Sequence, residues 1–496
     1  MAHWDISRSI AHWAMVKPSA PAIVCGDAEI SWEDFDREVD AFAARLVAGG
    51  VRFGDRVACL MGNRAEYYFV FFAVARIGAV FVPVNSSFTP PEVAFVVGDA
   101  GATALVTESV YREQAAKSSP PGVILDVDDL DDVAPAGART MADIPRPGFD
   151  DMVAILYTSG TTGKPKGATF THANFYFTAQ TLTSSFGFVP EDRHLVNSPL
   201  HFTGGLLTLS QAPVLTGGTI VLTTFTTAAD TIELIRRHRV TIYLSVPAIL
   251  TLIAHDPSFS PEAVRTLRVV SAGSAPLPLP LITTYSELGV ALGQAYALTE
   301  GGGMSTILLP DDVETRIGSA GRSTLYTEVR VVGPDGDAAA PGEVGEIQQR
   351  GPTVTAGYWN NDEANAELFA PGGWIRTGDL GTMDEHGYLT VVGRSKDVVI
   401  AGGVNVYPAE VESVLSGHPA LAEVAVIGLP HEVYGETVTA VVSLRPGMAA
   451  PTIEELHDYC ADRLAAYKIP RLLHVVDRLP RTASGKVRKI DLRVTR

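Results

Sequence analysis

The chain has 496 residues, and 38 Lys and Arg against 56 Asp and Glu give it a net charge of −18 at pH 7. This acidic balance excludes nucleic acid as the principal partner, because a phosphate backbone attracts basic surfaces. The content of 46% hydrophobic and 19% charged residues excludes a disordered or collagen-like chain. The length allows about two to four domains.

Cysteine usage and the N-terminus are typical of a cytoplasmic protein. Cys25, Cys59 and Cys460 are far apart and form no CxxC pair, so neither a disulfide framework nor a zinc site is predicted. We expect all three to be small buried hydrophobic residues. The N-terminus lacks the apolar run of a signal peptide, and we therefore expect a cytoplasmic location.

The most apolar stretch of the chain runs from Tyr68 to Val84. It contains Arg76 and Pro83 and is shorter than the roughly 20 apolar residues that a spanning helix needs, so no transmembrane segment is predicted. We expect a buried helix as far as Arg76, a turn at Gly78 and a buried strand over Val80–Val84.

Short apolar runs alternate with helical patterns from Val57 to about Val332, which predicts a large α/β body with mostly parallel sheets. Thr89 with Glu92, and Asp230 with Glu233, have the spacing of capping boxes that begin helices. The runs expected to form strands are Val57–Leu60, Ala104–Thr107, Met152–Tyr157, Thr219–Leu222, Thr241–Leu244 and Val269–Ser271.

The segment Lys117–Asp151 is rich in proline and aspartate. Metal ligands must be folded around one point, and nothing in this composition requires that. We expect a solvated connection between subdomains.

The pattern changes from about Glu328, where Glu328–Val332 and Glu343–Gln348 flank a Pro-Asp-Gly turn and predict antiparallel hairpin structure. After Gly393 the sequence predicts a separate small α+β domain. Its expected elements are a helix, two strands, a helix and a strand over Pro408–Leu415, Glu423–Ile427, Val438–Leu444, Ile453–Ala465 and Leu472–Val476.

A glycine-rich polar loop follows the predicted strand that ends at Tyr157. The sequence of 157–167 is YTSGTTGKPKG, in which glycines permit close approach of the backbone and hydroxyls and lysines donate to a polyphosphate. It is not a Walker A loop, because Pro165 follows Gly163-Lys164 where Ser or Thr is required. A polar surface loop without a ligand is the alternative.

This loop and four later motifs resemble, in content and order, the adenylate-forming family of acyl-CoA synthetases, adenylation domains and luciferases. The motifs are TSGTTGKPKG at 158–167, YALTE at 296–300, RTGDL at 376–380, GRSKD at 393–397 and PRTASGK at 480–486. The resemblance covers essentially the whole chain and is strongest to a stand-alone fatty or aryl acid–CoA ligase. It implies a large N-terminal multi-subdomain α/β body over residues 1–395 and a small mobile α+β domain over residues 396–496, with a hinge at Lys396.

The resemblance implies a small carboxylic acid, ATP and CoA as substrates and Mg²⁺ as cofactor. Glu300 resembles the family's magnesium-binding glutamate, Thr158 is a second candidate near the metal, and Thr299 would bind phosphate. Lys486 resembles the catalytic lysine, whose ammonium would bridge the acid carboxylate and the α-phosphate.

The nucleotide would be bound by residues from both predicted domains. Tyr296 would stack on adenine, and Asp379 would accept the ribose hydroxyls beside Arg394. Taken alone, Tyr296 could equally be a core aromatic residue, and Asp379 a turn residue. The residues expected to contact ATP are Thr158, Ser159, Gly160, Thr161, Thr162, Gly163, Lys166, Gly273, Ser274, Ala275, Tyr296, Asp379 and Arg394.

The candidate acid pocket is built of small or apolar residues with no carboxylate to hold an α-ammonium group, which favours a fatty or aromatic acid over an amino acid. Family members often have glycine in place of Ala297, and an aromatic residue followed by histidine around His201, so no specific acid can be transferred. His201 is either a core histidine or a polar contact. The expected pocket residues are His201, Phe202, Thr203, Gly204, Val246, Ala297, Gly301 and Gly302.

By resemblance, the small domain rotates about Lys396 between two half-reactions. It would present Lys486 for adenylation, and Gly402 and Gly403 along the path of the CoA pantetheine for thioester formation. Arg471–Arg496 carries eight Lys and Arg against two Asp and Glu, which concentrates basic residues near the phosphates. A carrier-protein pantetheine is the alternative acceptor, and an inactive nucleotide-binding scaffold is the alternative from another class.

Overall fold

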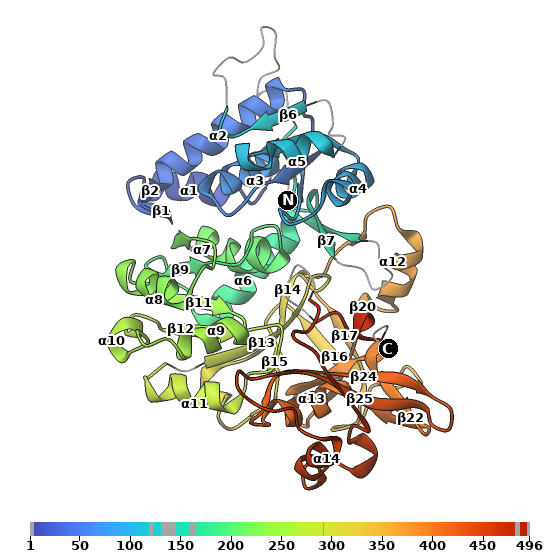
Figure 1. Cartoon of the computed structure of the whole chain (residues 1–496). Coiled ribbons are helices and arrows are strands. Elements are labelled where there is room, and N and C mark those ends of the chain that lie inside the picture. Colours follow the sequence, from blue (N-terminus) through green and yellow to red (C-terminus); the bar gives the residue numbers. More distant parts are fainter. Residues whose placement is uncertain are drawn as a thin grey trace. The chain divides into compact units, whose positions relative to one another are not determined.

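The computed structural model describes residues 4–118, 123–129, 145–158, 165–290, 292–481 and 487–493. The chain forms two compact units (Figure 1). The larger contains Met1–Val329 and Gln348–Arg376, and the smaller contains Arg330–Ile347 and Thr377–Arg496. The expected α/β body with a smaller C-terminal domain is confirmed, whereas a boundary at residue 395 and a hinge at Lys396 remain predictions.

The largest sheet of the body has nine strands. Its strands are β1 (Pro21–Cys25), β2 (Ala28–Ser31), β9 (Arg193–Val196), β10 (Thr219–Leu222), β11 (Ile242–Ser245), β12 (Val269–Ala272), β13 (Leu292–Leu298), β14 (Gly303–Leu308) and β15 (Arg322–Ser323). Their order is β15-β14-β13-β12-β11-β9-β10-β1-β2, with parallel pairing from β13 to β1 and antiparallel pairing at both edges.

A second sheet of the body has seven strands. They are β3 (Arg56–Leu60), β4 (Val80–Pro83), β5 (Ala102–Thr107), β6 (Val123–Asp126), β7 (Met152–Thr158), β8 (Lys166–Thr171) and β18 (Gly357–Tyr358). Their order is β18-β8-β7-β4-β3-β5-β6, and only the β18/β8 and β8/β7 pairs are antiparallel. All six strands predicted from apolar runs are present across the two sheets, so the mostly parallel α/β body is confirmed.

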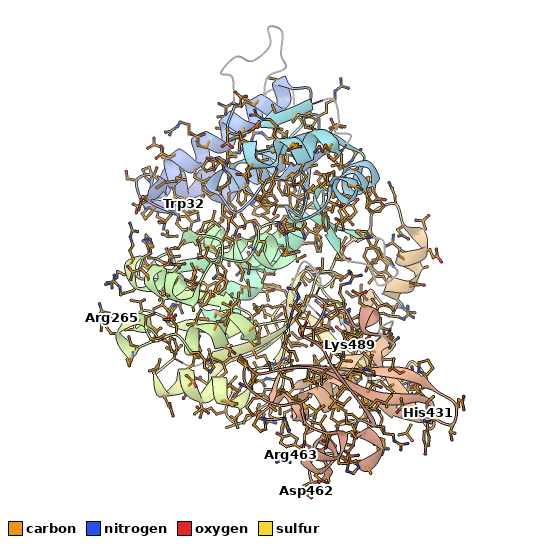
Figure 2. All side chains as sticks on the ribbon, viewed as in Figure 1. Trp32, Arg265, His431, Asp462, Arg463 and Lys489 are labelled. Carbon is orange, nitrogen blue, oxygen red and sulfur yellow. The ribbon has the colours of Figure 1, made fainter. Side chains whose placement is uncertain are left out.

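One apolar core joins the two sheets and their helices. Buried side chains from both sheets and from α2, α3 and α6 form a single cluster, and it includes Trp32, which Figure 2 labels at the start of α2. The helices of the body are α1 (Arg8–Val16), α2 (Trp32–Ala48), α3 (Ala65–Arg76), α4 (Pro90–Ala100), α5 (Arg112–Lys117), α6 (His172–Phe186), α7 (Gln211–Thr216), α8 (Ala228–Arg237), α9 (Pro247–Ala254), α10 (Pro261–Val264), α11 (Leu279–Glu287) and α12 (Asp362–Leu368).

The apolar stretch from Tyr68 to Val84 folds as predicted. α3 is buried over most of its length and ends at Arg76, and Gly78, with a φ of 67°, turns the chain into β4. No helix in the described part of the chain is long and apolar enough to cross a bilayer. A cytoplasmic location stays a prediction. Cys59 and Cys460 are buried and Cys25 is half-buried, and all three are free thiols.

The acidic segment after Lys117 is more than a connection. Val123–Asp126 forms β6, which pairs in parallel with β5 at the edge of the sheet. Asp126 binds Arg112 at 2.7 Å and Asp128 binds Arg64 at 2.8 Å, so these two carboxylates are held by arginines. The apolar run Val123–Leu125 lies between a Pro-Pro-Gly sequence and a run of aspartates, and the composition of the whole segment therefore predicted a connection.

One of the two predicted helix starts is confirmed and one is wrong. Thr89 and Glu92 form the predicted capping box of α4. At α8 the N-cap is Thr227, whose hydroxyl accepts from the backbone N–H of Asp230 at 3.1 Å. Asp230 lies inside the first turn and accepts hydrogen bonds from the hydroxyls of Thr226 and Thr227, so the helix begins earlier than predicted.

The smaller unit has the predicted order of helix, two strands, helix and strand, preceded by a hairpin that the sequence analysis missed. Its core is a separate apolar cluster. α14 ends at Ala461, four residues before the predicted end. The elements are β22 (Val399–Ala401), β23 (Val404–Val406), α13 (Pro408–Ser416), β24 (Leu421–His431), β25 (Gly435–Leu444), α14 (Ile453–Ala461), β26 (Leu472–Val475) and α15 (Lys489–Leu492), and the sheet order is β23-β22-β25-β24 with β26 beside β25.

A further sheet has five strands. They are β16 (Glu328–Val332), β17 (Gly345–Arg350), β19 (Phe369–Ala370), β20 (Trp374–Met383) and β21 (Leu389–Arg394). The order is β16-β17-β20-β19, with β21 also beside β20, so the two strands predicted on either side of the Pro-Asp-Gly turn are neighbours.

Candidate active site

The ends of the phosphate-loop motif are held side by side. Thr158 closes β7 and Lys166 opens β8, and the two are partners in the antiparallel pairing, with the Thr158 hydroxyl donating to the Lys166 carbonyl at 3.4 Å. The predicted ATP contacts between them lie outside the described residues. They are Ser159, Gly160, Thr161, Thr162 and Gly163.

Glu300, the predicted metal ligand, lies in the connection between β13 and β14 and is held at two points. The Tyr358 hydroxyl donates to its Oε1 at 2.6 Å, and the backbone N–H of Thr355 donates to its carbonyl at 2.9 Å. Burial, reinforced by the negative charge of Glu300, raises the pKa of Tyr358, so this phenol keeps its proton and donates. Lys166 places its Nζ 5.3 Å from the centroid of the Tyr358 ring.

Tyr358 is a site residue that the sequence analysis missed. It lies on β18, and its neighbour Gly357 has a φ of 128°, which marks a constrained backbone beside it. A tyrosine after a glycine has no specific meaning in sequence, and the partner that gives it one is 58 residues away.

The predicted phosphate and acid motifs meet through two hydroxyls. Thr203 Oγ1 and Thr299 Oγ1 are 3.0 Å apart, within hydrogen-bonding distance. Thr203 follows β9 and Thr299 follows β13, two strands whose carboxyl ends point to the same edge of the parallel sheet. Ligands of open α/β sheets bind at such edges.

Residues 198–203, between β9 and the π-helix η3 (Gly204–Leu209), contain the first predicted contacts to the acid substrate, and we call them the acid loop. This loop carries two adjacent aromatic rings. His201 and Phe202 are half-buried, and their ring centroids are 4.3 Å apart at an edge-on angle of 67°. Carbonyls of η3 accept from following side chains: Ser210 Oγ donates to Gly205 at 2.5 Å and Gln211 Nε2 to Leu206 at 2.9 Å. The two remaining pocket candidates with side chains, Val246 and Ala297, lie at the start of α9 and on β13.

The glycines after Glu300 are explained by packing. Gly302 has a φ of 73°, and a Cβ at this position would lie 1.8 Å from the carbonyl oxygen of Thr353. Gln349 donates to the carbonyl of Gly301 at 3.0 Å, and a Cβ on Gly301 would lie 2.4 Å from the Gln349 Oε1. Both glycines are buried, and their contact with the acid stays a prediction.

The predicted adenine stretch follows β12. Ser274 and Ala275 are exposed, and Ser274 has a φ of 73°, an uncommon conformation for a residue with a side chain. β12 and β13 pair with Ala272 opposite Gln294, and a Cβ on Gly273 would lie 3.6 Å from the carbonyl oxygen of Ala295, so the start of this stretch lies beside β13. Tyr296 is half-buried.

In the smaller unit, the predicted ribose pair is brought together. Asp379 on β20 and Arg394 on β21 are cross-strand partners, with 3.4 Å between Asp379 Oδ1 and Arg394 Nε. Gly402 and Gly403, with φ of 62° and 81°, form the turn between β22 and β23, where two positive φ values favour glycine. Lys396 lies in the short 3₁₀ turn after β21.

The predicted catalytic lysine, Lys486, lies outside the described residues. The flanking residues Arg481 and Val487 form an antiparallel bridge. Arg481 binds Glu423 and Lys489 binds Glu412 at 2.7 Å, so part of the basic C-terminal segment is neutralised by carboxylates of its own unit.

The single carboxylate of Glu300 suits a metal ion that arrives with its nucleotide. The described residues contain no group of three or more His, Cys, Asp and Glu that could hold a metal ion on its own. Mg²⁺ is commonly bound through one or two carboxylates together with substrate phosphates and waters. Glu300, next to the hydroxyl of Thr299, fits that donor set.

Burial lowers the pKa of His201 to about 4, so this imidazole is neutral at pH 7. A histidine with a lowered pKa binds its proton more readily in the unfolded chain, and stability therefore falls as the pH drops below about 6.5. From pH 7.5 to pH 5, the free energy of unfolding of the wild-type protein should fall by about 2 kcal/mol more than that of His201→Gln, which lacks the titrating imidazole. Urea unfolding at both pH values measures it, and equal losses in the two proteins would contradict the lowered pKa.

Comparison with known proteins agrees with these features. Residues 10–359 match the family model of the AMP-binding enzyme, and residues 410–486 match that of the AMP-binding enzyme C-terminal domain. The chain is 37% identical over 497 residues to feruloyl-CoA synthase of Amycolatopsis sp. and, separately, to long-chain-fatty-acid–CoA ligase FadD13 of Mycobacterium tuberculosis; each alignment covers 99% of this chain and 98% of the relative.

A solved structure extends the similarity to three dimensions. o-Succinylbenzoate CoA synthetase (MenE) of Bacillus subtilis, in complex with its acyl-adenylate intermediate, superposes with a TM-score of 0.89 at 33% identity, covering 100% of this chain and 99% of that one. The same enzyme has also been solved with ATP and a magnesium ion. With two family models in order and relatives of equal length that are CoA ligases, this chain belongs to the AMP-binding enzymes, as an adenylate-forming acyl-CoA ligase.

Proposed function

We propose that this ligase adenylates a fatty or aromatic acid with ATP and then transfers the acyl group to CoA. The observation that carries the proposal is the contact between Thr203 and Thr299, 3.0 Å apart, next to a Glu300 carboxylate fixed by Tyr358 at 2.6 Å. It joins the loop expected to bind the acid to the motif expected to bind phosphate and metal. Adenylation is possible only where the acid and the α-phosphate are neighbours.

The first half-reaction joins two anions. An oxygen of the acid carboxylate attacks the α-phosphorus of ATP, the bond from that phosphorus to the pyrophosphate oxygen breaks, and acyl-AMP and pyrophosphate result. In the proposal the loop 158–166 cradles the phosphates, Thr299 donates to one of them, and the Lys486 ammonium bridges carboxylate and α-phosphate. These groups place positive charge and donors where negative charge accumulates.

Mg²⁺ bound with ATP would neutralise phosphate charge and would be held by Glu300, with Thr158 as a second candidate. Tyr358 fixes the Glu300 carboxylate by donating to its Oε1, and a carboxylate held in this way would bind the ion. In the proposal, Tyr296 stacks on adenine beside the stretch 273–275, and Asp379 with Arg394 binds the ribose.

The second half-reaction transfers the acyl group to CoA. The CoA sulfur attacks the acyl carbonyl carbon, the bond from that carbon to the AMP oxygen breaks, and the thiol proton is lost. We propose that the smaller domain, from residue 396 onward, turns about Lys396 between the two steps and then presents the Gly402-Gly403 turn along the pantetheine path. Paired glycines at an exposed turn suit close passage of a thin chain.

The acid class follows from the pocket candidates and from the relatives. His201 is neutral at pH 7. The other candidates are apolar, small or hydroxylic, namely Phe202, Thr203, Gly204, Val246, Ala297, Gly301 and Gly302. None of them is a carboxylate that could hold an amino-acid ammonium. Curated relatives are named for ferulate, long-chain fatty acids and 2-succinylbenzoate, all acids without an ammonium group.

Pyrophosphate release tests this proposal when it is measured over fatty, aryl and amino acids, with and without CoA. We expect a fatty or aryl acid to support release, and a CoA thioester to form when CoA is added. Amino acids should give background rates. Release without thioester formation would contradict CoA as the acceptor and favour a carrier-protein pantetheine.

A further inference from the structure

Asn63 uses every hydrogen-bonding group of its side chain on the backbone near the acid loop. It follows β3 of the seven-stranded sheet. Its Nδ2 donates to the carbonyl of Ser198 at 2.9 Å and to that of Thr223 at 2.7 Å, and its Oδ1 accepts from the N–H of Leu200 at 2.9 Å. Two carbonyls and one N–H fix the orientation of the amide, since only the nitrogen can donate.

These contacts join strand ends of both sheets of the body. Ser198 and Leu200 follow β9, and Thr223 follows β10, which are neighbouring strands of the nine-stranded sheet. Leu200 is fully buried and lies directly before His201. Asn63 therefore holds the first part of the acid loop at both a carbonyl and an N–H.

The residues on either side of Asn63 are themselves anchored. The N–H of Gly62 donates to Glu108 Oε1 at 2.7 Å, and Arg64 binds the other oxygen of Glu108 at 2.9 Å. Arg64 also binds Asp128 at 2.8 Å. The backbone on both sides of Asn63 is therefore fixed, so the side-chain amide holds the loop in place and does not move with it.

At its other end the acid loop is held by the hydroxyl contact between Thr203 and Thr299. We infer that Asn63 is a positioning residue, which sets the loop 198–203 so that the acid pocket lines up with the phosphate motif. This inference rests on the proposed function. A displacement of the reacting groups by about 1 Å can cost a large part of the rate, which gives a hydrogen-bonded anchor outside the pocket its effect on activity.

The test compares Asn63→Ala and Asn63→Asp with Ser31→Ala in the full-length enzyme. Asn63→Asp keeps the size of the side chain and loses both donors to carbonyls. Ser31 is the N-cap of α2, and its hydroxyl accepts from the N–H of Asp34 at 3.1 Å, so its loss removes a structural hydrogen bond elsewhere in the same unit.

We expect both Asn63 variants to raise the KM for the acid about tenfold and to change the KM for ATP less than about twofold, and we expect Ser31→Ala to leave both KM values unchanged. In the double variant Asn63→Ala/Thr203→Val, the KM for the acid should rise by less than the product of the two single increases, because both residues hold the same loop. Equal KM values for the acid in Asn63→Ala, Asn63→Asp and Ser31→Ala would overturn the inference.

Hydrogen exchange gives a second readout that needs no substrate. The amide of Leu200 loses its acceptor in Asn63→Ala, so exchange should accelerate in a peptide covering residues 198–206 and stay unchanged in one covering α2. Unchanged exchange at 198–206 overturns the inference even if activity falls. If wild-type enzyme activates no acid, the proposed function fails, and the exchange result still decides whether Asn63 holds the loop.

Discussion

Lys486→Ala should abolish most acyl-AMP formation while it leaves thioester formation from supplied acyl-AMP largely intact. The reason is electrostatic: adenylation brings a carboxylate onto a phosphate, and one preorganised cation between them is worth about 10²- to 10³-fold in rate. Thioester formation starts from acyl-AMP, a mixed anhydride, and a thiol, so no carboxylate has to approach a phosphate in that step. Pyrophosphate exchange measures the first half-reaction, and CoA thioester formation from chemically prepared acyl-AMP measures the second.

Lys489→Ala is the matched control, since it removes the same charge three residues away. Lys489 lies on α15, where Figure 2 labels it, and binds Glu412 at 2.7 Å. We expect it to lower acyl-AMP formation less than about fivefold. Equal loss in both variants would assign the effect to the basic C-terminal segment as a whole. Equal loss of both half-reactions in Lys486→Ala would contradict a small domain that presents different residues in the two steps.

Glu300→Gln should lower acyl-AMP formation about 100-fold and raise the Mg²⁺ concentration needed for half-maximal rate. The amide keeps the shape of the side chain and can still accept from Tyr358, but it lacks the negative charge that Mg²⁺ prefers in a ligand. A magnesium titration of pyrophosphate exchange at fixed ATP separates the two effects.

Two variants calibrate this result. Tyr358→Phe keeps the carboxylate and removes its 2.6 Å hydrogen bond, so we expect a smaller loss, about five- to tenfold, in the same magnesium-dependent direction. Glu262→Gln removes a carboxylate that pairs at the surface of α10 with Arg265, labelled in Figure 2, and should leave activity unchanged. A Glu300→Gln enzyme with normal magnesium dependence would remove Glu300 from the metal site.

Much of the body could be predicted because its signals are local. Parallel strands buried on both faces are continuous apolar runs, and the turn from α3 to β4 is marked by a glycine at a left-handed position. The first residues of α8 were mispredicted since Thr227 and Asp230 both suit an N-cap, and only the hydrogen bond decides between them. β22 and β23, at three residues each, are too short for any periodic pattern.

The candidate site was less predictable because its supporting contacts span long sequence separations. The Tyr358–Glu300 bond links residues 58 positions apart, and the Asn63–Ser198 bond links residues 135 apart. The motif residues were named through the resemblance to the family, as Asp379 and Arg394 were before β20 and β21 were seen to pair them. A single sequence names the groups that do chemistry more readily than the groups that hold them.

The π-helix η3 makes the candidate acid pocket sensitive to the number of residues in the chain as well as to their side chains. Each π-turn closes one residue later than an α-turn and so holds an extra residue. Gly205 permits the tight packing of η3, since a Cβ there would lie 2.2 Å from the Pro199 carbonyl oxygen. Deleting one residue between Gly204 and Leu209 should convert the π-turn to an α-turn, which removes the extra residue and changes the directions of the side chains inside the turn. We therefore expect insertions and deletions at this point to change the range of accepted acids while every residue of the ATP motifs stays the same.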